Sequence, residues 1–276
     1  MVSLFRLAAV IIDFAARLLR ARPPRGHSPT PAAGRVAQPP LPATSRWHSR
    51  FGGRAWRYDS DGVHTREPDG GERLWRTSGA PLTCRAIMDS LGEVILWAAR
   101  KHGVSPALIL MTIATETASA RVHGFTGPAT FRWEPHVLNR DIAPAFRGTY
   151  SAGPMQILAT TARDLIATRG ADYGLNYASL ATAPALRQRP PTVPAALPLY
   201  DARTNVDLGT AVIRRQLRLT GNDPILVAAA YNAGGVYESG ANAWRLRSHG
   251  NHLDRAARWY GDACAVLAEA GSPQPR

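Results

Sequence analysis

The sequence predicts a mainly α-helical domain with a small β-ribbon N-terminal to it. Residues 105–119, SPALILMTIATETAS, are apolar on nearly every side of a helical wheel, which is typical of a helix buried inside a protein. Amphipathic segments with helix start or stop signals lie on both sides of this stretch. Hairpin-type turn signals, in contrast, gather in residues 47–81.

The first 46 residues are expected to lie outside the helical domain. A polar stripe runs along the otherwise apolar segment 1–21 and consists of Ser3, Arg6, Asp13, Arg17 and Arg20. This pattern predicts an amphipathic basic helix that suits a membrane surface and is too short and too charged to span a bilayer. A degenerate export signal and an incidental tail are the alternatives, because Asp13 interrupts the apolar core that a secretory signal needs. Residues 22–46 are rich in proline and alanine and predict a linker.

Residues 47–81 are predicted to form the β-ribbon that leads into the domain. Aromatic and polar residues alternate there around turn signals at 61–62 and 69–71, so we expect two or three short strands. Trp56 and Trp75 are candidates for stacking on sugars, although packing onto neighbouring helices is the commoner use of such residues.

The region 82–270 is expected to fold as one helical domain. An amphipathic helix is predicted over 84–102 and ends at Gly103. The apolar helix follows, with Ser105 as N-cap and Pro106 as its first residue. Residues 121–150 are predicted to be irregular.

The second half of this region is expected to contain four more helices. These cover 160–168, closed by Gly170, and then 204–220, 223–233 and 252–269. The start signals are Asn205 with Asp207 for the second of them and Asp223 with Pro224 for the third. A proline-rich surface loop is expected over 181–198.

The charge of the chain favours a polyanionic partner. The formal net charge is +13 and the pI is about 10.9, so nucleic acid, anionic lipid and the acidic polymers of a bacterial envelope all qualify. No zinc-finger spacing, basic zipper or aromatic RNA-binding signature accompanies the charge, so no specific nucleic-acid partner is expected. Cys84 and Cys264 form either a disulfide or two free core thiols, and they lack histidines at metal-ligand spacing. We expect a monomer without a metal.

Glu116 is the only ionisable residue in the apolar stretch and lies where that stretch ends. Partial desolvation raises the pKa of a carboxyl and suits it to general-acid catalysis near neutral pH. The alternative is a solvated glutamate at the end of a helix.

Three further segments supply side chains that can be placed around Glu116. In the first, YSAGPMQI at 150–157, Gly153 allows a ligand to approach the backbone closely. Gln156 supplies both a donor and an acceptor for amide or hydroxyl groups.

The other two segments lie on either side of it in the sequence. AAYNAGG at 229–235 ends a predicted helix in glycine and offers the aromatic face of Tyr231 and the amide of Asn232. RWEPH at 132–136 contributes a second carboxyl, Glu134, in a loop. Each segment alone is also consistent with an ordinary turn, helix end or loop.

In this order the motifs resemble those of the soluble lytic transglycosylases, which belong with goose-type lysozymes to the lysozyme-like superfamily. The order is a glutamate at the end of a buried helix, then S-x-G-x-M-Q-I with T-A after it, then A-A-Y-N-A-G. The resemblance covers about 84–269 and implies a lysozyme-like (transglycosylase) helical domain. The Trp-Glu-Pro-His segment and the proline-rich N-terminus look more like phage-borne members.

The resemblance implies roles for individual residues. Glu116 matches the catalytic acid, and the substrate-binding positions match Tyr150, Ser151, Gly153, Met155, Gln156, Tyr231 and Asn232. In that family the acid protonates the glycosidic oxygen between N-acetylmuramic acid and N-acetylglucosamine of peptidoglycan. The same carboxylate then takes the proton of the muramoyl 6-hydroxyl, which closes a 1,6-anhydro ring. No cofactor is implied.

The sequence also departs from the family pattern. Thr117 follows the glutamate where serine is usual, Pro154 replaces an aliphatic residue, and the later catalytic-site tyrosine is either Tyr237 or Tyr260. Goose-type lysozymes carry a water-positioning aspartate just after the M-Q motif, and this chain has Leu158-Ala159 there, which favours a transglycosylase.

Two other functions are weighed against this one. A hydrolytic N-acetylmuramidase would use Glu116 as acid and Glu134 as base, or Asp141 to activate a water, and an inverting pair needs its carboxyls roughly 6.5–9.5 Å apart. A non-catalytic peptidoglycan-binding or virion structural module is the third possibility. The resemblance implies action in the cell envelope or periplasm by a phage lysin, a virion enzyme or a wall-remodelling enzyme. The basic N-terminus is then a candidate contact with an anionic membrane or envelope surface.

Overall fold

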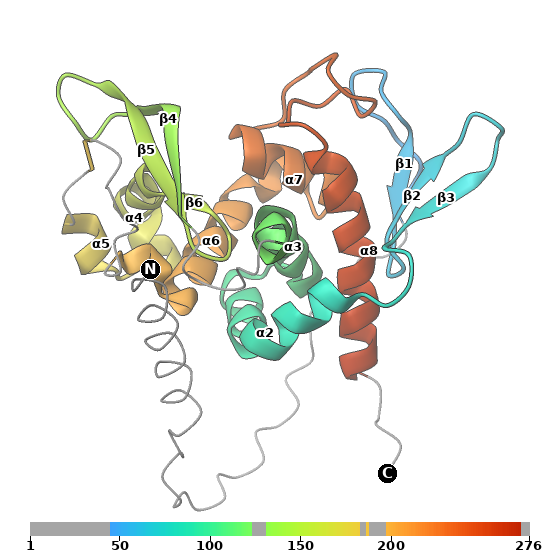
Figure 1. Cartoon of the computed structure of the whole chain (residues 1–276), viewed down its shortest axis with the longest axis horizontal. Helices are drawn as coiled ribbons and strands as arrows, with labels where there is room; N and C mark the ends of the chain where they lie inside the picture. Colours follow the sequence, from blue (N-terminus) through green and yellow to red (C-terminus); the bar gives the residue numbers. More distant parts are fainter. Residues whose placement is uncertain (1–44, 123–130, 183–185, 188–196, 272–276) are drawn as a thin grey trace, which may run out of the picture. The chain divides into compact units, whose positions relative to one another are not determined.

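Helices predominate in the part of the chain that the structure describes. A computed structural model describes residues 45–122, 131–182, 186–187 and 197–271, all within one compact unit, Pro39–Arg276. This part contains seven α-helices and two small antiparallel sheets (Figure 1). The structure is therefore mixed: 52% is helical, which agrees with the expected helical domain in part, and the expected β-ribbon is present, whereas the second sheet was not expected. The predicted N-terminal helix and almost all of the linker lie outside the described residues.

The β-ribbon is a three-stranded antiparallel sheet with its strands in sequence order. Its strands are β1 (Trp56–Tyr58), β2 (Val63–Arg66) and β3 (Glu72–Trp75), and the predicted turns at 61–62 and 69–71 connect them. Trp56 and Trp75 are both buried in the same hydrophobic core as the helices. Their role is therefore packing, and neither is available to stack on a sugar.

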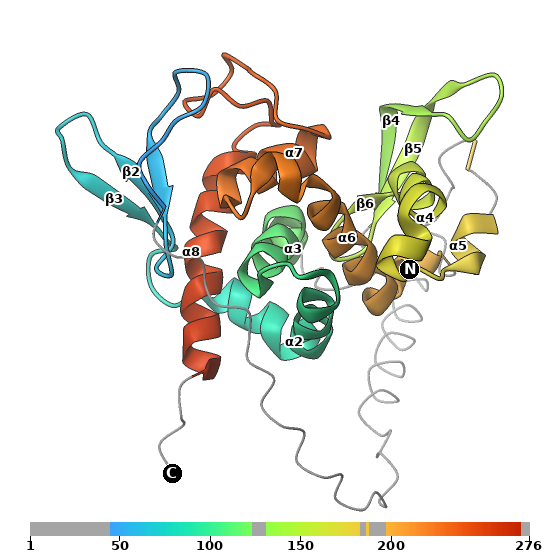
Figure 2. The ribbon, with the colours of Figure 1, turned by 180° about the vertical axis from the view of Figure 1, so that it is seen from behind.

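Helix α3 (Pro106–Val122) forms the centre of the core. Apolar residues from Ala107 to Ala114 are all buried, as expected for a helix that is apolar all round. Helices α2, α6, α7 and α8 each contact α3 (Figures 1 and 2). Ser105 precedes the helix as predicted, but its hydroxyl has no hydrogen-bond partner among the described residues, so the predicted side-chain cap is wrong. Only the Ser105 carbonyl joins the first turn, accepting from the backbone N–H groups of Leu108 and Ile109.

Helix α2 (Leu82–His102) matches its predicted range to within two residues at its start. Gly103 ends it in the left-handed conformation, with φ of 63°. Its apolar side consists of Ile95, which is buried, and of four residues that are half-buried against the core: Ile87, Leu91, Val94 and Trp97. The end of the helix therefore follows its sequence signal.

The segment predicted to be irregular, 121–150, contains most of the second sheet. Strand β4 (Phe131–Asn139) pairs with β5 (Phe146–Ala152), which pairs with the short β6 (Ile157–Leu158). The prediction was wrong because Pro135 lies inside β4, where proline normally argues against a strand. The sheet tolerates it because β4 is an edge strand whose pairing register shifts between Glu134 and Leu138.

Helix α4 (Ala159–Tyr173) extends past its predicted end at Gly170. Gly174 ends it instead, with φ of 61°. A short helix α5 (Ala178–Thr182) and a 3₁₀ turn η1 (Pro198–Tyr200) border the predicted proline-rich loop, of which residues 183–185 and 188–196 lie outside the described part.

Helix α6 (Ala202–Thr220) begins earlier than predicted. Asp201 is its N-cap, because its carboxylate accepts a hydrogen bond from the backbone N–H of Thr204 at 2.7 Å. Asn205 and Asp207, the predicted start signals, are instead fully buried inside the helix. Both make hydrogen bonds to distant parts of the chain, and that explains why polar residues occupy the core there.

The last two helices, α7 (Pro224–Ala233) and α8 (His252–Gly271), form as predicted. The carboxylate of Asp223 caps α7 by accepting hydrogen bonds from Ile225 and Leu226. Its other oxygen accepts from the Trp56 indole at 2.9 Å and contacts His48 Nε2 at 2.7 Å, and this contact raises the pKa of His48. One carboxylate therefore joins the ribbon to α7.

Two remaining findings concern the cysteines and the membrane. Cys84 and Cys264 are both buried free thiols, so the disulfide alternative is wrong. Burial raises the pKa of both thiols. Within the described residues no helix has the length and apolar character needed to cross a membrane.

Candidate active site

Glu116 lies at a small pocket where three helices meet. The pocket is lined by residues of α3, α7 and α8, namely Met111, Thr112, Thr115, Glu116, Ala228, Tyr231 and His252. Glu116 is half-buried in the last part of α3, where the fully buried run of that helix ends. Thr117, next to it, donates its hydroxyl hydrogen bond to the Ile113 carbonyl of the same helix at 2.7 Å. The predicted desolvated glutamate at the end of a buried helix is thus present.

The surroundings of Glu116 raise the pKa of its carboxyl to about 7. Burial is the main cause, because removal from water disfavours the charged form. The positive charges of Arg132 and Arg255 act in the opposite direction, and the negative charge of Glu134 adds to the increase. A carboxyl with this pKa can both give and accept a proton near neutral pH.

Glu134 lies on β4 and is held by its neighbours. Its side chain is only 12% exposed. The Ser151 hydroxyl lies 3.1 Å from Glu134 Oε1, Arg132 Nε lies 3.2 Å from the same oxygen, and His136 Nε2 lies 3.8 Å from Oε2. The structure therefore brings the second predicted carboxyl into the electrostatic surroundings of Glu116, on a strand and not in a loop.

The first predicted substrate-binding segment turns sharply between β5 and β6. Gln156 has φ of +47°, and its side-chain amide donates to the Gly153 carbonyl at 3.0 Å. Ser151 Oγ lies 3.2 Å from Gln156 Oε1, so the serine connects Gln156 with Glu134. Tyr150 and Met155 are buried, and Tyr150 stacks on Phe131 with ring centroids 5.4 Å apart. These two side chains pack in the core beneath the segment and are not accessible to a polymeric substrate.

Gly153 serves packing and not, as expected, the close approach of a ligand. A Cβ atom at this position would lie 2.2 Å from Asn205 Nδ2 and 2.5 Å from the Leu199 carbonyl oxygen. Asn205 fixes the turn by donating to the Ala152 and Leu199 carbonyls and accepting from the Met155 backbone N–H. The glycine therefore makes room for the buried asparagine of α6.

Gly153→Ala is expected to lower the free energy of unfolding by about 2–5 kcal/mol. The added methyl group meets both backbone strain, because φ is +75°, and a rigid neighbour that cannot move aside. Urea denaturation of the variant measures the loss. Gly240→Ala is the matched control, since a Cβ there has nothing within 4 Å and no strained φ, and an equal loss in both variants would contradict this explanation.

The third motif lies at the end of α7, where Tyr231 lines the Glu116 pocket. The Tyr231 hydroxyl donates to the Met155 carbonyl at 2.8 Å, which ties the end of α7 to the turn after β5. Burial raises the pKa of Tyr231, and the nearby Glu116 adds to the increase. Asn232 is exposed, and its side-chain oxygen accepts from the His249 backbone N–H at 3.0 Å. The three motifs therefore converge from α3, the second sheet and α7.

Other predicted alternatives lie elsewhere. Asp141 forms an ion pair with Arg163 in the loop after β4. Tyr260 is fully buried, and its surroundings include Cys264, Tyr58 and Asp223 on the ribbon side of α8. Tyr237 is 49% exposed in the loop after α7. The structure shows no contact of these side chains with Glu116.

Sequence reasoning missed two residues of α8. His252 lines the Glu116 pocket, and burial together with Arg255 lowers the pKa of His252 to about 4, so its imidazole is neutral at neutral pH. The Nε of Arg255 is buried without a hydrogen-bond partner among the described residues, and its charge reaches Glu116. No local motif marks either residue, because their relation to Glu116 depends on how α8 packs on α3.

The site combines a carboxyl whose pKa is raised to about 7 with the side chains of Tyr231 and His252 at one small pocket. The described residues contain no cluster of three or more potential metal ligands. No protein-family model matches the sequence, and a search of curated proteins returns no match.

The raised pKa of Glu116 makes a prediction about stability. Between about pH 4.5 and pH 7 the folded state holds a proton that the unfolded state has released, so this group stabilises the fold at low pH and the effect is lost as the pH rises through 7. The difference corresponds to about 3 kcal/mol. The free energy of unfolding of Glu116→Gln, measured relative to that of the wild type, should therefore increase by up to that amount from pH 4 to pH 8. Denaturant titrations of both proteins at the two pH values measure it, and a constant difference between them would contradict the raised pKa.

Proposed function

We propose that this protein cleaves the β-1,4 bond between N-acetylmuramic acid and N-acetylglucosamine in bacterial peptidoglycan, using a lysozyme-like helical domain. The observation that carries the proposal is the Glu116 carboxyl, whose pKa burial raises to about 7 in a pocket that Tyr231 of the third motif also lines. The motif order in the sequence supports the choice of substrate. The net charge of +13 suits an acidic envelope polymer.

In this mechanism Glu116 acts first as acid and then as base. Its protonated carboxyl donates to the glycosidic oxygen as the bond to the muramoyl C1 breaks. The resulting carboxylate accepts the proton of the muramoyl 6-hydroxyl, whose oxygen bonds to C1 and forms the 1,6-anhydro ring. The carboxyl is thereby restored, and no water enters the product. Arg132 and Arg255 support the ionised form in the second step.

The remaining residues are assigned to binding and support. Gln156 offers a polar group from the turn, and Asn232 offers its exposed amide at the end of α7. Ser151 is buried on β5 and supports Gln156 and Glu134 from there. Tyr231 holds the turn against α7 through the Met155 carbonyl. We place the site of action in the cell envelope or periplasm, with peptidoglycan as partner and the protein acting as a monomer.

The hydrolytic alternative rests on one observation. Glu134 is close enough to influence the Glu116 carboxyl, as the base of a muramidase would be. Against it, three neighbours, Ser151, Arg132 and His136, surround the Glu134 carboxyl. A non-catalytic module has no observation of its own in its favour.

Mass spectrometry of the product ends tests the proposal. Purified peptidoglycan is digested with the protein, and the released muropeptides are analysed. Ends of 1,6-anhydro-N-acetylmuramic acid are expected. Reducing N-acetylmuramic ends would establish the muramidase instead, and the absence of any soluble product would overturn glycan cleavage.

A further inference from the structure

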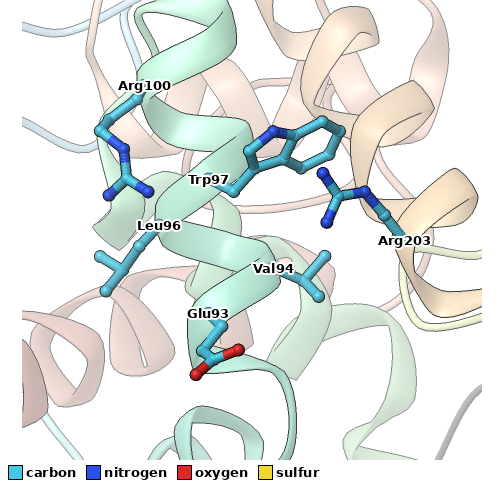
Figure 3. A pocket seen from close by; sticks show the side chains of 6 residues that line it. All are labelled: Glu93, Val94, Leu96, Trp97, Arg100 and Arg203. Atoms are coloured by element: carbon cyan, nitrogen blue, oxygen red, sulfur yellow. The ribbon is translucent and has the colours of Figure 1, made fainter. Parts of the chain in front are cut away.

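A second pocket lies between α2 and the start of α6 and shares no residue with the Glu116 pocket. It is lined by Glu93, Val94, Leu96, Trp97 and Arg100 of α2 and by Arg203 of α6 (Figure 3). The mechanism proposed for Glu116 uses none of these residues. Their combination of charges around an aromatic ring calls for an explanation.

Trp97 forms the centre of this pocket and is flanked by two cations. The guanidinium carbon of Arg203 lies 3.9 Å from the centroid of the indole ring, and Lys101 Nζ lies 5.1 Å from it. Lys101 is already neutralised, because its ammonium donates to the buried carboxylate of Asp207 at 2.6 Å. Arg203 has no ion pair with any residue in the described ranges. Stacking fixes the plane of its guanidinium and leaves the N–H groups at its edge free to bind an oxyanion.

The charges of the pocket are separated along α2. Arg100 and Arg203 lie on either side of Trp97, while Glu93 lies at the opposite end of the view in Figure 3. Arg100 lies seven positions after Glu93 on the helix, which corresponds to about 10 Å along the axis. Neither of these two exposed side chains is ion-paired within the part of the chain that the structure describes. The apolar side chains of Val94 and Leu96 lie between the charged ends.

We propose that this pocket binds a short peptide with free termini, with its ammonium at Glu93 and its carboxylate at Arg100, while Arg203 adds positive charge from the other side of Trp97. An extended peptide advances about 3.3–3.6 Å per residue, so about three residues span the distance between the charges. A central aliphatic side chain packs on Trp97 and Val94. A simple anion would use the two arginines but would leave Glu93 without a role.

The walls of the pocket are held in place before any ligand binds. Asp207 of α6 is bonded to both Lys101 and His102 at the end of α2, each at 2.6 Å. This contact fixes the two helices that carry Trp97 and Arg203. A site whose walls are fixed loses little conformational entropy on binding.

NMR titration of the full chain with the tripeptide Ala-Leu-Ala tests this proposal independently of the chemistry at Glu116. The signal of the Trp97 indole N–H, assigned with Trp97→Phe, should shift and saturate. Amidation of the peptide carboxylate or Arg203→Gln should each weaken binding about fivefold, as expected for a solvent-exposed charged contact. N-acetylation or Glu93→Gln should weaken it to a similar degree, whereas the control Arg218→Gln, an exposed residue elsewhere on α6, should not.

Three outcomes would overturn the proposal. The first is a Trp97 signal that does not respond to the peptide. The second is equal binding of the free, amidated and acetylated peptides, which would mean that the pocket does not recognise the charged termini of the peptide. The third is inorganic phosphate producing the same shift with the same affinity, which would identify a simple anion site.

Discussion

Replacing Glu116 with glutamine is expected to lower the rate of peptidoglycan cleavage by roughly 10²–10⁴-fold. Glutamine has the same size and keeps a polar group at the pocket, but it can neither donate the proton to the leaving oxygen nor accept one afterwards. Initial rates of muropeptide release measure the effect. In the wild type, the rate should also fall as the pH rises above about 7, because burial raises the pKa of Glu116 to that value and the acid must be protonated.

Glu134→Gln is the matched control for this prediction. It removes the other carboxyl of the site and retains a partner for the Ser151 hydroxyl. If Glu116 is both acid and base, the cleavage rate of the control should fall by less than about tenfold. In a muramidase that uses both carboxyls, the two variants would lose comparable amounts of cleavage rate. Wild-type activity in the Glu116 variant would show that the catalytic acid lies elsewhere.

Replacing Asp207 with alanine is expected to lower the free energy of unfolding by about 3–5 kcal/mol. Its fully buried carboxylate accepts hydrogen bonds from Lys101 Nζ and Tyr177 Oη and lies 2.6 Å from His102 Nε2. Burial alone would raise the pKa of Asp207, but these contacts outweigh it and keep the pKa below its ordinary range. Removing the carboxylate leaves the polar groups of three side chains without their partner.

Thermal unfolding measures this loss, and the midpoint should fall by roughly 10 °C. Asp164→Ala provides the comparison, because Asp164 forms an ion pair with Arg215 of α6 but its side chain is 58% exposed. An exposed pair of this kind contributes less than about 1 kcal/mol. Equal midpoints for the two variants would contradict the assigned importance of the buried network.

The sequence alone predicted the parts of the fold that depend on local signals. The helix around Leu108 was evident because it is apolar all round, and the ribbon because its turns contain glycine and aspartate. Gly103 and Asp223 ended and began helices as their residue types predict. The placement of Glu116 followed from the first of these signals.

The parts that were missed depend on contacts between residues far apart in the sequence. Pro135 argued against a strand at β4. Only the pairing of β4 with β5 shows that β4 lies at the edge of a sheet, where proline is tolerated. Asn205 resembled a helix start because its buried partners, the backbone around Ala152 and Leu199, are not visible from its neighbours. Arg255 and His252 were missed for the same reason, since tertiary packing alone brings α8 to the Glu116 pocket.

The Asp223 carboxylate, which contacts both the ribbon and α7, limits how this chain can be divided when chimaeric proteins are made. Asp223 serves as helix cap and as acceptor for Trp56 at the same time, and Gly261 of α8 leaves room for the backbone of Trp75. A fragment that started at Leu82 would expose the surfaces that Trp56 and Trp75 cover. In a chimaeric protein, the ribbon and the helices would therefore have to be transferred together, as one structural unit.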